Sequence, residues 1–139
     1  MISMAPALVA ASSAIILFLG LIHLLYTFRG SKLHPRDAAL QARMKEVSPV
    51  LSRETTMWKT WIGFNASHSL GAIFFGLIYG YLALAQGPFL FQSPFLLLLG
   101  LGFLAAYAFL GKVYWFSVPF RYILVATALY GAALAVRWA

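Results

Sequence analysis

The sequence predicts an all-α integral membrane protein, in which four transmembrane helices form a bundle and a short amphipathic helix lies on the cytoplasmic side. Composition is the first indication, since 63% of the 139 residues are hydrophobic and only 9% are charged, a balance far from that of soluble domains. The second is the presence of four apolar runs long enough to cross a hydrocarbon core of ~30 Å as helices. A transmembrane β-barrel is excluded, because its strands would alternate between polar and apolar residues and these runs do not.

The spans are expected at about residues 8–28, 58–85, 94–111 and 119–138 of a single domain covering residues 1–139, with a cytoplasmic connection at residues 29–56. No lysine or arginine precedes the first run, so it lacks the basic region of a secretory signal and should be retained as a span. Gln86-Gly87-Pro88 should end the second helix. Ser93-Pro94 should start the third, because serine is a favoured N-cap and proline suits the first helical position.

Within the first connection, residues 35–47 predict a short helix at the membrane interface, because apolar residues recur there at helical spacing. Ser48-Pro49 is a further helix-start signal. We therefore expect a nearly continuous helix over residues 48–85, which would carry Glu54 above the lipid core.

The basic residues indicate the orientation, because lysine and arginine near span ends are retained on the cytoplasmic side. Seven lie in or beside the first connection and two, Lys112 and Arg121, flank the third, so nine of the ten share one side and only Arg137 lies on the other. Both termini are therefore expected outside the cytoplasm. Short loops around a single-chain bundle suit a bacterial inner membrane.

The net charge of +7 is explained by these same membrane-flanking residues. With no soluble domain to carry a binding surface, the expected partners are membrane lipids and an apolar small molecule rather than nucleic acid. The chain has no cysteine, which removes thiolate metal sites, iron–sulfur clusters and cysteine nucleophiles. Histidine is left as the residue for any metal chemistry.

The first two spans carry polar side chains into what should be lipid, where each is costly unless it faces protein, water or a ligand. His23 is six residues from Arg29, and Asn65 is six residues from Lys59. Each therefore lies ~9 Å inside a basic boundary residue, with His68 at ~14 Å. These three side chains should occupy one layer.

Thr27 and Trp61 share helix stripes with these residues. We therefore expect a pocket in the cytoplasmic half of the bundle, walled by His23, Thr27, Trp61, Asn65 and His68. In one interpretation it binds an apolar or lipid-like ligand and can act on it. His68 would then be the acid or base, Asn65 would orient the substrate and His23 would be a second polar contact.

Two other interpretations stay open. His23 and His68 could ligate haem b, either together or with one of them bound and the other site open. Alternatively, the protein could be a non-catalytic accessory subunit whose polar layer only fixes helix pairing. Ser67 and Ser69 are explained by hydrogen bonds to the preceding helical turn. A proton- or sodium-coupled transporter is not favoured, because the spans contain no aspartate or glutamate.

Two further patterns are architectural. Gly76, Gly80, Gly100 and Gly102 allow helices to approach closely, either within one chain or between copies in a homo-oligomer. Tryptophans near span ends fit the aromatic belts of membrane interfaces.

The end of the first span reads IHLLYTFRG, and the segment leading into the second reads SRETTMWKTWIGFNASHSLG. With four spans in this length, the chain resembles a functionally uncharacterised family of small four-helix bacterial inner-membrane proteins. The resemblance covers most of the chain and implies the fold and the membrane, but no mechanism. In size and topology the chain is also similar to EXPERA-type sterol isomerases. Those enzymes place acidic residues within their spans and this chain does not, so that likeness is one of architecture alone.

Overall fold

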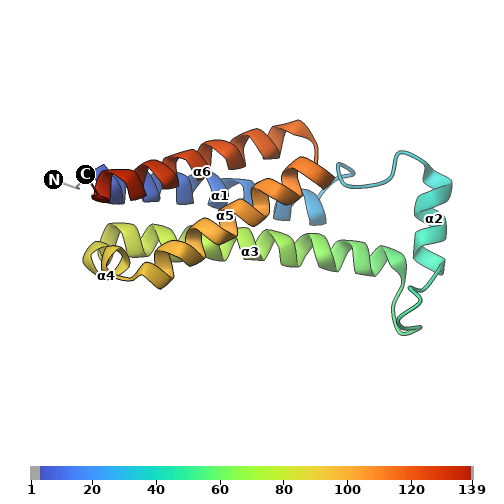
Figure 1. Ribbon diagram of the computed structural model, residues 1–139. Coiled ribbons are helices and arrows are strands. Elements are labelled where there is room, and N and C mark those ends of the chain that lie inside the picture. Colours follow the sequence, from blue (N-terminus) through green and yellow to red (C-terminus); the bar gives the residue numbers. More distant parts are fainter. Residues whose placement is uncertain (1–3, 139) are drawn as a thin grey trace. The chain divides into compact units, whose positions relative to one another are not determined.

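The computed structural model describes residues 4–138, and no strand occurs in that range (Figure 1). Its elements are α1 (Met4–Phe28), α2 (Ala38–Glu46), α3 (Met57–Ala85), α4 (Gly87–Gln92), α5 (Pro94–Tyr114) and α6 (Ser117–Trp138). The helices α1, α3, α5 and α6 are each long and apolar enough to cross a membrane. The predicted all-α membrane fold is therefore confirmed.

The continuous helix predicted over residues 48–85 is wrong in its first part. Residues 47–56 form a loop, and α3 begins only at Met57. The hydroxyl of Thr56 accepts a hydrogen bond from the Lys59 N–H at 3.3 Å and so satisfies one of the free donors at the start of the helix. A threonine cap therefore starts α3 nine residues after the expected position.

The short helices also differ from expectation. Asp37 begins α2 by accepting hydrogen bonds from the N–H groups of Ala39 and Leu40, so this helix is shorter than the predicted range 35–47. Between α3 and α5 the chain forms the unpredicted helix α4, whose first turn contains proline. Ser93 caps α5 as predicted, with its hydroxyl accepting from the Leu96 N–H at 3.3 Å.

The structure consists of two compact units. Unit 1 comprises the chain up to Leu19 and from Ala72 onward, and unit 2 comprises Gly20–Gly71. The helices α1 and α3 contribute residues to both units, whereas α5 and α6 belong to unit 1 and α2 to unit 2.

Close contact between helices marks the core of unit 1. A Cβ atom placed at Gly76 would lie 2.6 Å from the Leu17 Cβ and 2.8 Å from the Ser13 carbonyl oxygen. The absence of a side chain at this position therefore lets α3 pack directly on the backbone of α1. Gly102 differs, since nothing lies within 4 Å of a Cβ placed there.

Hydroxyl groups add hydrogen bonds between the helices of unit 1. Each donates to a backbone carbonyl of another helix: Ser12 to Ala126 at 2.7 Å, Tyr79 to Leu96 at 2.7 Å, and Tyr130 to Leu97 at 3.2 Å. Because these groups are buried or half-buried among apolar side chains, a partner for each avoids the cost of an unpaired polar group.

A ladder of aromatic rings also runs through unit 1. In order of contact the rings are those of Tyr130, Tyr79, Phe75, Phe103, Tyr107 and Trp115. The Phe75 and Phe103 rings lie nearly parallel, at 8° with centroids 4.4 Å apart, and the Phe103 and Tyr107 centroids are 4.2 Å apart. This aromatic ladder joins α3 to α5 by stacked rings and α3 to α6 by the edge-to-face contact of Tyr79 with Tyr130.

Candidate functional site

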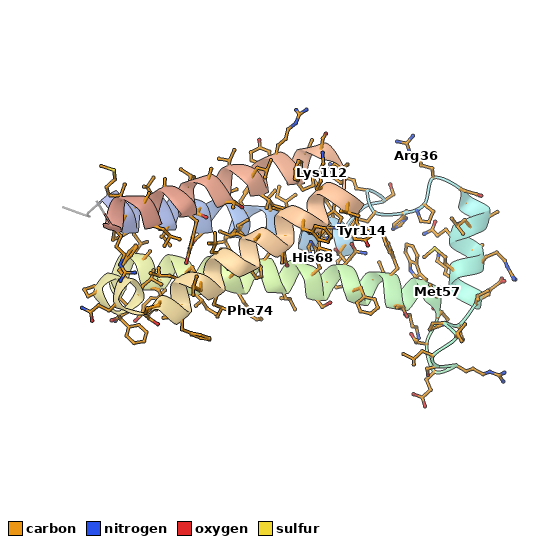
Figure 2. All side chains as sticks on the ribbon, in the orientation of Figure 1. Arg36, Met57, His68, Phe74, Lys112 and Tyr114 are labelled. Carbon is orange, nitrogen blue, oxygen red and sulfur yellow. The ribbon has the colours of Figure 1, made fainter. Side chains whose placement is uncertain are left out.

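The polar layer forms within unit 2, where the last turns of α1 meet the first turns of α3. His23 Nε2 and Asn65 Oδ1 are 2.9 Å apart and hydrogen-bonded. The rings of His23 and His68 meet edge to face, with centroids 5.2 Å apart and planes at 84°; Figure 2 shows His68 on α3. The structure therefore brings together the three side chains that the sequence places at one level.

The amide group of Asn65 has a fixed orientation. Its Nδ2 donates to the carbonyl of Trp61 at 2.8 Å, so Oδ1 is the atom that faces His23. An amide oxygen only accepts, and His23 must therefore donate from Nε2. In the neutral ring the unprotonated nitrogen is then Nδ1. The backbone of Trp61 thus sets the tautomer of His23 through Asn65.

The structure shows a positioning role for Asn65 within the protein. Its oxygen and its nitrogen are both engaged by the protein, one by His23 and the other by Trp61. In this arrangement Asn65 positions the imidazole of His23.

Thr27 and Trp61 use their donors elsewhere. The buried Thr27 hydroxyl donates to the His23 carbonyl one turn back, at 2.8 Å. The Trp61 indole Nε1 donates to the Leu33 carbonyl at 3.0 Å, and 42% of this residue is exposed. Thr27 and Trp61 can therefore give the layer apolar surface, while the imidazoles supply its polar chemistry.

The serines of α3 form local hydrogen bonds, as the sequence suggested. Ser69 donates to the Asn65 carbonyl at 2.8 Å, and Ser67 donates to the Phe64 carbonyl at 3.1 Å. Both bonds lie within one helix and need no function to explain them.

The two imidazoles are not arranged as a bis-histidine haem site. Such a site requires rings on opposite faces of the macrocycle, each with a nitrogen directed at the iron. Here the rings touch each other, and His23 directs Nε2 to Asn65. A metal ion held by side chains alone is a separate case, and among residues 4–138 no group of three histidine, cysteine, aspartate or glutamate side chains could hold one.

A second cluster in unit 2 was not predicted. The ring of Trp58 meets the His34 ring edge to face at 5.0 Å, and Lys45 Nζ lies 5.7 Å from the Trp58 centroid. Gln41 Nε2 is 3.2 Å from His34 Nδ1. These contacts hold α2 against the start of α3. The sequence contained one signal for this cluster, a tryptophan at a span end near basic residues. The partners of Trp58 could not be predicted, because they depend on the fold of the loop between α2 and α3.

Unit 1 has a recess of about 420 Å³. It is lined by Met4, Ala5, Pro6, Gly87, Pro88, Phe91, Val136 and Arg137. None of the predicted site residues belongs to this lining.

Comparisons with protein-family models, with curated proteins and with solved structures found no match to this chain.

Proposed function

We propose that the protein binds an apolar, lipid-like molecule within the membrane and contacts its polar group through His23 and His68. The observation that carries the proposal is the hydrogen bond from His23 to an Asn65 amide that is itself held by a backbone carbonyl. This bond leaves the Nδ1 of His23 as an acceptor of defined position. Binding sites for small molecules are mostly apolar, with a few placed polar groups, and ionisable residues within spans usually mark such sites.

The same arrangement supports acid–base chemistry on the bound molecule. Imidazole can take up or release a proton near neutral pH, and the spans supply no carboxylate for this purpose. His23 would accept a proton or a hydrogen bond at Nδ1, and His68 would serve as the second acid or base. Asn65 would keep His23 in its reactive tautomer.

A second function, that of an accessory or scaffold subunit, is favoured by a different observation. The hydrogen bonds of Asn65 are formed with the protein itself, and the bond to His23 joins two spans. In this case the layer fixes how α1 pairs with α3 in unit 2, and no ligand is needed.

A His68→Gln variant separates the two functions. Glutamine keeps hydrogen-bonding capacity but loses the imidazole, so helix pairing should survive while ligand contact and proton transfer are lost. The parent and the variant are purified in mild detergent, their melting temperatures are compared, and copurifying small molecules are identified by mass spectrometry. The matched control is Ser67→Ala, because the Ser67 hydroxyl bonds only within α3.

Ligand binding predicts a stoichiometric apolar molecule in the parent and in Ser67→Ala, and its loss from His68→Gln at an unchanged melting temperature. An unchanged ligand content in His68→Gln would remove His68 from the site. A parent without any such molecule, together with a His68→Gln variant that melts like it, would support the scaffold function. An absorption spectrum of the same samples with a Soret band would contradict the interpretation of the histidine geometry.

A further inference from the structure

We infer that the loop at residues 47–56 docks on an anionic membrane surface and inserts Val50 and Leu51 among the phospholipid headgroups. Val50 is 109% exposed and Leu51 is 96% exposed. Both residues precede the start of α3, so lipid tails around the spans do not account for their exposure. Two adjacent apolar side chains presented in this way mark an interaction surface.

Hydrogen bonds give this loop a defined shape. The Met57 N–H donates to the Val47 carbonyl at 2.8 Å and joins the two ends of the loop. The Ser52 N–H donates to the Pro49 carbonyl at 3.3 Å and closes a turn. Val50 and Leu51 occupy the two central positions of that turn, so their side chains project from its tip.

The loop lies at the level of the membrane interface. Its joined ends meet the first residue of α3, next to Trp58, and tryptophan near a span end is typical of the headgroup region. Figure 1 shows the loop beside the first turn of α3, and Figure 2 marks Met57 at that turn. Leu51 lies four residues after Val47, the joined end of the loop, and four residues of chain span at most ~14 Å. The tip of the turn can therefore reach the headgroups around the start of α3.

The whole connection that carries the tip is basic, and this charge favours an anionic surface. Arg43, Lys45, Arg53 and Lys59 are all exposed. From Arg29 to Lys59 the chain carries seven basic and three acidic residues, a net charge of +4, and one of the acidic groups, Glu46, is paired with Arg43 at 3.2 Å. Basic residues beside a membrane are attracted to anionic headgroups, and inserted apolar side chains add to the binding.

The chain has no cysteine, so Leu51→Cys provides a single thiol for an environment-sensitive NBD fluorophore. The labelled full-length protein is reconstituted into vesicles of phosphatidylcholine, with or without phosphatidylglycerol, that carry nitroxide-labelled lipids. We expect about twofold quenching and a blue-shifted emission in the anionic vesicles, and little of either in the zwitterionic ones. Because both leaflets have the same composition, the result does not depend on the orientation of the inserted protein.

Two matched variants complete the experiment. Val50→Ser in the labelled protein should reduce the quenching, because half of the apolar tip is lost, and Arg53→Gln should weaken its dependence on phosphatidylglycerol. Both positions are exposed, so the two variants should melt like the parent. A fluorophore that stays unquenched in both kinds of vesicle would overturn the inference and leave the tip facing water, as expected of a docking site for a soluble protein. Equal quenching in both would overturn the preference for anionic lipid.

Discussion

Asn65 is the residue of the polar layer through which several hydrogen bonds are connected. Its side chain joins the backbone of Trp61 to the ring of His23, and its own carbonyl accepts the Ser69 hydroxyl. Trp61 in turn donates its indole N–H to Leu33 in the connection after α1. The tautomer of one imidazole is thus linked, through the Asn65 side chain and Trp61, to the connection between α1 and α2.

The first prediction concerns Asn65→Leu, which removes both the acceptor for His23 and the donor to Trp61. Nitrogen NMR of labelled histidine should show a single His23 tautomer in the parent, protonated at Nε2, and a mixture in the variant. A double-mutant cycle with His23→Leu should give a coupling energy of about 1 kcal/mol, as is usual for hydrogen bonds between spans. Ser67→Ala is the control. An unchanged tautomer in Asn65→Leu would refute the role assigned to this residue.

The level of the polar layer could be predicted from the sequence, but its hydrogen bonds could not. A helix rises by a constant distance per residue, so His23 and Asn65 could be placed at a common depth by counting from basic residues. Their bonding depends on helix rotation and side-chain rotamers. The carbonyls of Trp61 and Leu33 that complete the network are backbone groups, which every residue has and no sequence pattern distinguishes.

At the scale of helices, the contact of α1 with α3 in unit 1 depends on Gly76. The atoms that a Cβ would meet there include the Ser13 carbonyl oxygen and the Leu17 Cα, which belong to backbone and cannot rotate away. The second prediction is therefore that Gly76→Ala destabilises the protein by about 1–3 kcal/mol through overpacking. Unfolding in mixed micelles, followed by circular dichroism, measures the effect.

Gly63→Ala is the matched control for this substitution, since both glycines lie inside α3. Nothing lies within 4 Å of a Cβ placed at Gly63, so only helix propensity should change there, with a gain of up to about 1 kcal/mol. Equal effects at Gly63 and Gly76 would show that the close approach of α1 and α3 is not what constrains Gly76.

The helices themselves were predicted unequally well. The long apolar helices were found because the thickness of a bilayer imposes their length. The start of α3 was not, since Ser48-Pro49 is only a local signal and the chain beyond it is held as a loop by the Val47–Met57 hydrogen bond. The short helix α4 was also unexpected, because Gly87 and Pro88 indicate a break but not how many turns follow it.

For the molecule as a whole, the distribution of basic residues predicts the orientation in the membrane. The third prediction is that single cysteines at Ser31 and Gln86 react oppositely with an impermeant thiol reagent in intact cells. Ser31 belongs to the connection between α1 and α2, and Gln86 lies between α3 and α4. Both are exposed. If lysine and arginine are retained in the cytoplasm, Gln86→Cys should be labelled from outside and Ser31→Cys only after permeabilisation.

The reverse labelling pattern would place both termini in the cytoplasm, and equal labelling of the two sites would contradict any single orientation. A cysteine at Ala42, which is exposed on α2, serves as a second site in the first connection and should behave like the one at Ser31.

The overall fold class was the easiest property to predict, because it follows from composition and the lengths of the apolar runs. The orientation of the chain in the membrane is decided when its helices insert, and not by how they pack against one another.

The aromatic ladder of unit 1 gives the protein an optical signature. Rings held at fixed angles, such as those of Phe75, Phe103 and Tyr107, absorb in an asymmetric environment and should produce a strong near-ultraviolet circular dichroism signal. Such a signal disappears when side-chain packing loosens, even where the helices persist. Because the ladder lies entirely within unit 1, its ellipticity can follow the tertiary structure of that unit without an added label. It should fall in Gly76→Ala before the far-ultraviolet helix signal changes.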